Sequence, residues 1–381
     1  MNRERFTGLI IAALLVISIA SYVSTRRNAA HQGHDALLFP ALAGELATVS
    51  SVDVRKGSAT PSVSLRKKGD EWIVAQRADY PADVAKMRKL LLSMSDAKII
   101  EEKTSDPAKY AVINVDDPTK ANAAGTQVDF TAKDGAHSLI VGKPSGENNF
   151  VRRGGETTSY LVAPGIYVEF EPRLWIDTKL LDIPADDIDR IDYKPAAGTP
   201  YSVHRVVPPA PAPAPPSAPA AAAASAASAA PTAPAPAAPQ RPSEFVLDGA
   251  PSGRKPADSP TLAPSPATVG NLTADDVAAV ADIDFTKAAS TIITMKDGAT
   301  IALTGTVVGD KHWIQVNAPK DQALMSRIAG RAFQVATYRY DGLFRPLEQL
   351  LVPKPAPPDK GAKQPPTPSP LKAAKQSPKA P

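Results

Sequence analysis

The chain repeats part of its own sequence, and this repeat restricts its possible folds more than any other feature. Lys133-Asp134-Gly135-Ala136 returns later as Lys296-Asp297-Gly298-Ala299. Three further matches lie at the same offset: Phe130 with Ile293, Gly142 with Gly305, and Asn149–Arg152 with His312–Gln315. Matches of this extent predict two tandem copies of one folded unit. The sequence also predicts a membrane anchor, described below. A duplicated, strand-rich unit behind such an anchor is more typical of a scaffold or binding module than of an enzyme.

Alternating apolar and polar residues predict short strands at matching places in both copies. In the first copy the runs are Val49–Val54, Ser62–Arg66, Glu71–Val74 and a meander within 126–162. In the second copy they are Ile188–Ile191, Tyr201–Arg205, Glu244–Leu247 and a meander within 291–338. Asp134-Gly135 is a strong signal for a hairpin turn. When the strands of the two copies are aligned in order, Glu244–Leu247 matches Glu71–Val74.

One helix per copy is expected to pack on each sheet. Asp83 is the expected cap of a helix over Val84–Met94, whose apolar residues recur on one face and predict core packing. Thr273 is the expected cap of the second helix, Thr273–Ile283, with Asp276 as its capping-box acid. The predicted fold class is therefore α+β: two tandem copies of an antiparallel sheet with one packed helix, after an N-terminal transmembrane helix.

An uncharged stretch near the N-terminus predicts the membrane anchor. Phe6–Val23 contains no charged side chain and has about the shortest length that crosses a bilayer as a helix. Arginines flank it on both sides, so the free amino terminus is what favours a cytoplasmic N-terminus. Ser18-Ile19-Ala20 also fits a signal-peptide cleavage site, but the apolar run continues to Val23 and favours an uncleaved anchor. Either interpretation places the rest of the chain in the periplasm, with membrane lipid as the partner of Phe6–Val23.

Proline is concentrated in two tracts that we expect to be disordered. Residues 207–243 are rich in alanine and proline and interrupt an expected hairpin, which a fold tolerates because loop closure costs little more for long loops. The tail carries six lysines against one aspartate and accounts for the net charge of +4. The expected order is a cytoplasmic stub (1–5), the transmembrane anchor (6–23), a juxtamembrane linker (24–44), a first unit (45–183), a second unit (184–352) with the insertion (207–243), and the basic tail (353–381).

The sequence offers no recognisable catalytic or cofactor site. Cysteine is absent, which excludes disulfides and thiol chemistry. No phosphate-binding glycine motif and no nucleophile motif occurs. His31, His34 and Asp35 form a close set, but no further ligand follows at a zinc-site spacing. We therefore assign no catalytic, cofactor-binding or metal-binding residue and expect no cofactor.

The remaining polar groups have structural interpretations. His204 and His312 are expected to be ordinary strand residues. Arg152-Arg153 is compatible with an anion site or with solvated charge at a strand end. Aromatic residues make up only 6% of the chain and do not alternate with basic ones, so nucleic acid is not an expected partner. Three aspartate pairs near turns or helix starts are interpreted as caps: Asp116-Asp117, Asp186-Asp187 and Asp275-Asp276.

Several stretches of the chain together resemble a known family. They are Trp72 with Tyr80–Asp83 and the helix to Met94, then Lys103–Tyr110, Leu139–Gly142, Phe150–Arg152 and Leu180–Ile183. In these stretches the chain resembles the bacterial domain of unknown function 4340 family, over about residues 48–200 and more loosely to about 350. The resemblance implies a single-pass inner-membrane protein with its bulk outside the cytoplasm, often encoded beside ABC transporters of the gliding-motility kind. The family has no assigned catalytic residues, so the resemblance implies none for this chain.

These features predict a non-enzymatic, membrane-anchored extracytoplasmic accessory protein of an ABC-type transport or envelope-assembly complex. Its protein partners would belong to that complex. Candidate contact surfaces are the helices Val84–Met94 and Thr273–Ile283 and any exposed sheet edge. One alternative is an envelope-polymer-binding tether or scaffold that uses the basic tail. Another is an enzyme whose site has no recognised motif.

Overall fold

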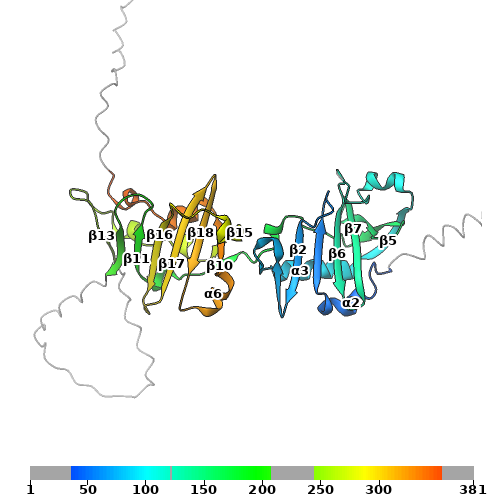
Figure 1. Ribbon diagram of the computed structural model, residues 1–381, viewed down its shortest axis with the longest axis horizontal. Helices are drawn as coiled ribbons and strands as arrows, with labels where there is room; N and C mark the ends of the chain where they lie inside the picture. Colours follow the sequence, from blue (N-terminus) through cyan, green and yellow to red (C-terminus); the bar gives the residue numbers. More distant parts are fainter. Residues whose placement is uncertain (1–35, 121, 207–243, 354–381) are drawn as a thin grey trace, which may run out of the picture.

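Two antiparallel sheets make up most of the folded chain. The computed structural model describes residues 36–120, 122–206 and 244–353. Within these residues the sheets dominate and the helices are few and short, so the expected α+β class is confirmed. Figure 1 shows the two sheets beside each other along the long axis of the molecule. The expected stub and anchor, the histidine set at 31–34, the insertion 207–243 and nearly all of the tail lie outside the described residues.

The first sheet, called here the N-terminal sheet, has nine strands in the part of the chain that the structure describes. Their order across the sheet is β4-β3-β2-β1-β6-β7-β8-β9-β5. The bounds are β1 Ser51–Arg55, β2 Val63–Lys68, β3 Glu71–Val74, β4 Tyr80–Pro81, β5 Lys98–Thr104, β6 Thr126–Ala132, β7 Gly135–Ser145, β8 Asn148–Arg153 and β9 Ser159–Ala163.

The second sheet, called here the C-terminal sheet, has eight strands among the described residues. Their order is β13-β12-β11-β16-β17-β18-β19-β15, which repeats the order of the first sheet without its edge strand β4. The bounds are β11 Ile188–Lys194, β12 Tyr201–Val206, β13 Glu244–Asp248, β15 Asp276–Ala279, β16 Ala289–Met295, β17 Thr300–Val308, β18 Lys311–Asn317 and β19 Arg331–Val335.

The pairing registers match as well as the strand order. In each sheet the central opening strand pairs on one side with the second strand and on the other with the first strand of the meander. Residues that occupy the same register position can therefore be compared directly. These pairs are Val52 with Ile191, Leu65 with Val203, Val74 with Leu247, Phe130 with Ile293, and Val151 with Ile314. The predicted alignment of Glu71–Val74 with Glu244–Leu247 is confirmed.

The repeated tetrad forms a turn in both sheets, but not the same turn. In the first, Ala132 pairs with Gly135 and leaves a two-residue loop. In the second, the last pair is Thr294 with Thr300, so the loop is longer. The longer loop shifts the following strand by one residue, and Gly305 occupies the register position of Val141.

The predicted match of Gly142 with Gly305 is therefore wrong. A Cβ on Gly142 would contact the backbone of Ile113, whereas a Cβ on Gly305 would contact the ring of Phe344. Each glycine permits close approach of a different element, so their alignment in sequence is a coincidence.

The first predicted helix is confirmed. α3 covers Val84–Asp96, and the Asp83 carboxylate accepts hydrogen bonds from the backbone N–H groups of Ala85 and Lys86. The side chains of Met87 and Met94 are buried, as the core interpretation predicts. Val84, expected on the same apolar face, is half exposed.

The second predicted helix, Thr273–Ile283, is wrong. Those residues form β14 (Leu272–Thr273), β15 and the 3₁₀ helix η6 (Val280–Asp282). Asp276–Ala279 pairs with Arg331–Gln334 of β19, and this long-range ladder outweighs the helix propensity of an alanine-rich segment. Two four-residue helices, α4 (Ser259–Leu262) and α5 (Pro266–Val269), take the place of α3 in the chain order.

Other short elements complete the fold. α6 (Gln322–Ile328) lies between β18 and β19, and α7 (Thr337–Leu343) follows β19, where an extension of the strand to Tyr338 was predicted. β10 (Lys179–Leu181) pairs with β14. The 3₁₀ helices are η1 Leu46–Thr48, η2 Ala75–Arg77, η3 Pro107–Ile113, η4 Pro172–Trp175, η5 Ala185–Asp187 and η7 Leu347–Leu350.

A segment expected to be linker packs against the N-terminal sheet. Leu38, Phe39 and Leu42 are buried, and the Phe39 ring contacts the Phe130 ring edge-on with centroids 5.3 Å apart. α2 (Leu42–Glu45) and η1 belong to this segment, which we call the arm, residues 37–48. Burial of these apolar side chains is the physical reason why the ordered fold begins before residue 45.

The two sheets share one hydrophobic core. A single cluster of buried side chains extends across both, and Tyr80 from β4 contacts Phe333 from β19 with ring centroids 5.4 Å apart. Arg331 donates to the carbonyls of Ala78 and Asp79, at 2.9 and 3.1 Å. Arg77 and Asp276 form an ion pair across the same junction. In Figure 1 the junction lies between β15 and the blue strands of the N-terminal sheet.

No helix in the described parts of the chain is long and apolar enough to cross a membrane.

Candidate functional site

The main polar site lies on the face of the N-terminal sheet that is turned away from the shared core. Strand alternation places Val52 and Val54 in the core and Asp53 and Arg55 on the opposite face. A groove of about 680 Å³ opens there, and we call it the polar groove. It is lined by Ser51, Asp53, Arg55, Asp117, Gln127, Asp129, Phe130, Thr131, Ala136, His137, Ser138, Ile140, Arg152, Gly154 and Gly155.

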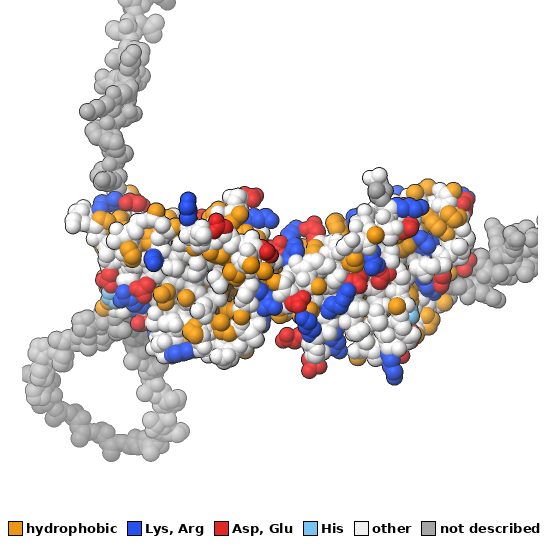
Figure 2. Space-filling model, in the orientation of Figure 1, with side chains coloured by type: hydrophobic (Ala, Val, Ile, Leu, Met, Phe, Trp, Pro, Cys, Tyr) orange, Lys and Arg blue, Asp and Glu red, His pale blue; other side chains and the backbone are white. Residues whose placement is uncertain are grey.

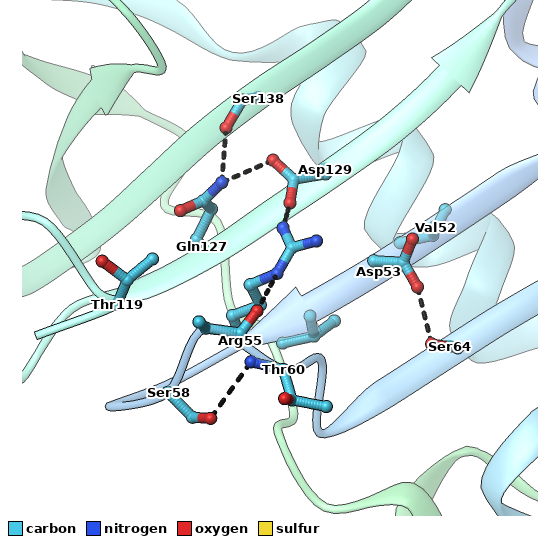
Figure 3. A network of polar contacts seen from close by, with 12 residues as sticks. Val52, Asp53, Arg55, Ser58, Thr60, Ser64, Thr119, Gln127, Asp129 and Ser138 are labelled. Atoms are coloured by element: carbon cyan, nitrogen blue, oxygen red, sulfur yellow. Dashed lines mark hydrogen bonds and ion pairs between the residues drawn. The ribbon is translucent and has the colours of Figure 1, made fainter.

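One polar network crosses β1, β6 and β7. Arg55 forms an ion pair with Asp129, and each side chain is only about a quarter exposed. The Gln127 amide donates to Asp129 Oδ1 at 2.6 Å and to Ser138 Oγ at 3.0 Å. Figure 3 shows these groups pointing toward one another from neighbouring strands. Because both ends of the ion pair are partly buried, the pair is screened less than one in open solvent.

A second network joins β1 to β2. The Ser64 hydroxyl donates to Asp53 Oδ1 at 2.6 Å, and the Arg66 guanidinium donates to both oxygens of the same carboxylate at 2.8 and 3.0 Å. A bidentate arginine of this kind fixes the carboxylate in one orientation. The Gln76 side chain accepts the Ser64 backbone N–H at 2.8 Å, which adds one more contact to this network.

The other rim is held by the segment that precedes β6. Arg152 donates to the carbonyls of Val115 and Glu156 at 2.9 Å each and lies 4.7 Å from the Tyr110 ring centre. Asp117 Oδ1 accepts the backbone N–H and the hydroxyl of Thr119, and these two hydrogen bonds lower the pKa of the Asp117 carboxyl. Arg152, one of the two arginines considered for anion binding, is thus used to fix a loop.

The central charges of the groove are paired with one another. Asp53, Asp129 and Arg55 each have partners on the protein, so their charges offset one another locally. A nucleophile needs an adjacent base that is itself oriented by a third group. Ser64 has only the arginine-bound Asp53, which is an acceptor already held by Arg66. The arrangement can accept a polar ligand by exchanging hydrogen bonds at the surface.

The C-terminal sheet repeats part of this pattern. Asp192 and Ser202 occupy the register positions of Asp53 and Ser64. Their partners differ: Arg190 donates to both, at 2.8 and 2.9 Å. Three further positions also compare: Lys194 stands where the first sheet has Arg55, His204 where it has Arg66, and Ile292 where it has Asp129. With an isoleucine in place of the aspartate, the central ion pair is missing from the described part of the second sheet.

The histidines among the described residues, His137, His204 and His312, have ordinary partners. His137 stacks on Phe130 with centroids 5.0 Å apart and lies 2.8 Å from Asp134. His204 Nδ1 lies 2.9 Å from Asp248 Oδ2. His312 contacts Tyr340, with ring centroids 4.9 Å apart. The described residues hold no group of three or more metal-ligating side chains.

The aspartate pairs are only partly explained by capping. Asp117 holds a turn, as expected. Asp186 and Asp187 lie in η5, without a side-chain cap. Asp276 pairs with Arg77 across the junction, so its expected capping-box role is wrong.

Two buried tyrosines are the most perturbed titratable groups among the described residues. Burial raises the pKa of Tyr193 to about 12, and burial together with neighbouring Tyr193 raises the pKa of Tyr201 further. Their rings stack with centroids 5.0 Å apart. Burial thus disfavours ionisation of both hydroxyls, and the Tyr201 hydroxyl donates to the Arg345 carbonyl.

Sequence reasoning missed the polar groove. Its residues are alternate positions of separate strands, and each one alone looks like a solvated surface charge. The available signal was the run of outward-facing polar residues Asp53-x-Arg55 and Gln127-x-Asp129, which become neighbours only when β1 and β6 pair.

Comparison with known proteins gives a family for this region. Residues 72–251 match the family described as a domain of unknown function, DUF4340. This part of the chain belongs to the DUF4340 family. The DUF4340 region runs from β3 to just after β13, so it crosses the junction and includes Gln127, Asp129 and Arg152 of the groove. Asp53 and Arg55 precede it. No curated protein and no solved structure matches the chain.

Proposed function

We propose that this protein is a non-enzymatic, membrane-anchored accessory protein of an ABC-type transport or envelope-assembly complex, with its folded part in the periplasm. The observation that carries the proposal is the polar groove, whose central charges, Arg55, Asp129, Asp53 and Arg66, are paired with one another. A catalytic groove requires at least one group held ready for a reaction partner. A self-paired groove suits a recognition surface or a rigid frame.

The shape of the molecule supports a scaffold. Two sheets beside each other give a long, continuous framework with one core (Figure 1). Acidic and basic side chains are interspersed over the face shown in Figure 2, without one large patch of a single sign. We propose that the two sheets arose by duplication, with units 45–183 and 184–352 and the insertion 207–243 in the second, because strand order and register agree.

The membrane part of the proposal rests on the sequence. Phe6–Val23 is uncharged and long enough to cross a bilayer once, and it would contact lipid and permease helices. The bacterial inner membrane is the proposed location. The association of DUF4340 members with ABC transporters of the gliding-motility kind supports the choice of complex, although the family itself implies no mechanism.

The test is an in-cell crosslinking pull-down of the full chain. It is run beside a matched variant in which a cleavable signal sequence replaces Phe6–Val23, so that both proteins reach the same compartment. We expect ABC permease and ATPase subunits to be recovered with the native segment and lost with the replacement. Equal recovery with both proteins would place the contact on the folded part, and no recovery of such subunits with either would refute the accessory role.

A second candidate function is a tether that binds an anionic envelope polymer. The tail from Pro353 carries six lysines and one aspartate, and this charge favours anionic surfaces. Truncation at Pro353 is expected to abolish co-pelleting with anionic wall material. Retained pelleting by the truncated protein would remove this candidate without affecting the first.

A further inference from the structure

The 3₁₀ helix η3 presents a small apolar surface at one end of the molecule. Its side chains Pro107, Ala108, Ala111 and Val112 are exposed, and we call them the apolar end patch. Val112, at 72%, is the most exposed large hydrophobic side chain among the described residues. In Figure 1 β5, the strand that leads into η3, lies at one end of the molecule and β13 lies at the other.

The inner side of η3 is packed against the N-terminal sheet. Side chains at positions i and i+3 eclipse in a 3₁₀ helix, so Tyr110 and Ile113 both face the sheet. They pack with Val115 and Ile140 in a small core of their own, and the Tyr110 hydroxyl donates to the Thr157 carbonyl. The outward side of η3 is therefore a fixed surface of the fold.

Traced toward the N-terminus, the first described residues run along β5 in the direction of η3. Leu37 forms an antiparallel bridge with Lys98 at the start of β5, and the Ile99 N–H donates to the Ala36 carbonyl at 2.8 Å. Because this pairing is antiparallel, the step from Leu37 back to Ala36 has the same direction as β5 on its way to η3.

The proposed membrane anchor is close to this point in sequence. Only the twelve residues 24–35 separate Phe6–Val23 from Ala36. Fully extended, they would span at most about 40 Å. β5 covers seven residues, Lys98–Thr104, and is thus about 20 Å long, so η3 lies within reach of the anchor. A short tether gives a local concentration of about 1 mM, at which even a weak contact is populated.

The charges around the apolar end patch are balanced. Lys109 lies 3.8 Å from Asp106, and Lys103 lies 2.6 Å from Glu101. These charges offset one another, so the apolar side chains are the main basis for a contact at this end. Apolar residues beside paired charges suit the boundary between lipid headgroups and acyl chains.

We infer that the apolar end patch contacts the membrane surface, with Ala111 and Val112 at the boundary between headgroups and acyl chains. The N-terminal sheet is then the half of the molecule held against the bilayer. This inference depends on the membrane anchor of the proposed function, and it adds a lipid contact of the folded part that the anchor alone does not require.

The experiment uses the absence of cysteine, which makes a single introduced cysteine a specific site for a probe. Full-length Val112→Cys is labelled with the environment-sensitive dye NBD, in nanodiscs of phosphatidylcholine with nitroxide-labelled acyl chains. Val307→Cys, at an exposed valine of β17 in the C-terminal sheet, is the matched control. We expect about twofold quenching of the probe at position 112 and hardly any at position 307, without anionic lipid.

Two further variants test the patch and the tether separately. Ala108→Glu with Ala111→Glu changes only exposed positions of η3 and should remove most of the quenching at position 112. Insertion of about 24 Gly and Ser residues into 24–35 should weaken the contact, because the local concentration falls about fivefold. The same insertion after Pro353 should change nothing.

Three results would overturn the inference. One is no quenching at position 112 in protein that is present in the nanodiscs. Another is equal quenching at positions 112 and 307, which would show no preference for the patch. The third is quenching that requires anionic lipid and is lost at high salt, which would assign the contact to charge. Full-length protein that fails to enter nanodiscs would instead refute the anchor, and with it the proposed function.

Discussion

The two sheets share the order of eight strands, and the segment before each opening strand packs in a similar way. In the N-terminal sheet the arm buries Leu38, Phe39 and Leu42 against the strands. In the C-terminal sheet residues 179–187 take its place: Leu180, Leu181 and Ile183 are buried, and the Lys296 N–H donates to the Asp187 carbonyl at 2.8 Å. The similarity of the halves therefore extends to the segment that precedes each sheet, and they differ mainly in the side chains that face away from the core.

The faces turned away from the core, called here the open faces, do differ. The N-terminal sheet has a partly buried ion pair between Arg55 and Asp129. The C-terminal sheet has Lys194 and an exposed Ile292 at these positions. The comparison teaches that the two sheets keep apolar side chains at matching core positions, while the matching positions on the open faces carry different chemistry.

The largest expected effect comes from removing the arm's anchor residue. Phe39→Ala deletes a ring that is buried between Phe130 and His137, and it should lower the free energy of unfolding by about 3 kcal/mol. Ile301→Ala, at the partly buried position of the second hairpin that pairs with Ile293, should cost only about 1 kcal/mol. Urea denaturation of the two variants measures the contrast. Equal losses would mean that Ile301 is packed as tightly as Phe39.

The second effect concerns the junction and asks whether the sheets unfold together. Arg331→Ala leaves the carbonyls of Ala78 and Asp79 without their donor, at two consecutive residues with φ of +52°. The loss should be about 2 kcal/mol, the cost of a hydrogen bond to a charged group. Combined with Arg77→Ala, it should split one calorimetric transition into two.

Arg331→Lys is the matched control, because it keeps the charge but not the forked donor geometry. It should recover only part of the stability. A single transition in the double variant would show that the shared core around Tyr80 and Phe333 is sufficient to couple the sheets.

The third effect concerns the glycine that the sequence aligns wrongly. Gly305→Ala should cost about 1–2 kcal/mol, since the new Cβ would contact the rings of Phe344 and Tyr340 of α7 and the residue after it. Gly44→Ala, the control, meets open space in α2 and should be neutral or stabilising by up to about 0.5 kcal/mol. Thermal denaturation compares the two. Tolerance of Gly305→Ala would mean that α7 moves freely over β17.

The fourth and smaller effect concerns the ion pair on the open face. A double-mutant cycle of Arg55→Ala and Asp129→Ala should give a coupling of about 1 kcal/mol, at the upper end for partly exposed pairs. Arg55→Lys with Asp129→Ile copies the C-terminal sheet and should restore most of the stability, because an ion pair and an apolar contact are often interchangeable. A coupling near zero would mean that the ion pair of the polar groove stabilises the fold no more than a fully solvated surface pair does.

How much of this could be predicted from the sequence depended on the range of the interactions involved. Val84–Asp96 was predictable because its cap and its apolar face are local. Thr273–Ile283 was not, because β15 is defined by its ladder to β19 and the local alanine content favours a helix. The repeat predicted the shared register, but not the extra loop residue that displaces Gly305.

The candidate site shows the same limit. The polar groove depends on β1 and β6 lying side by side, and this relation is not visible in one strand at a time. An aligned comparison of the two copies would have found Asp129 against Ile292, which is the difference that separates the two open faces.

The smallest expected effect tests a similarity between the halves that the tetrad alignment missed. Asp117 accepts the N–H and hydroxyl of Thr119, and Asp284 accepts those of Thr286, just before β6 and β16 respectively. In both carboxyls these hydrogen bonds lower the pKa below the ordinary value of 3.8. A carboxyl with a lowered folded-state pKa stabilises the fold above its unfolded pKa, and the contribution is lost as the pH falls through the folded value.

Asp117→Asn and Asp284→Asn should therefore each lower the urea midpoint slightly at pH 6, and the difference from the parent protein should shrink toward pH 3. Asparagine keeps an acceptor oxygen but not the charge, so the pH dependence isolates the carboxylate from the turn itself. If the two turns are equivalent, the two variants should behave alike. A pH-independent loss at both positions would show that turn geometry alone is responsible. A loss at Asp117 alone would show that the carboxylate stabilises only the first turn, the one beside the polar groove.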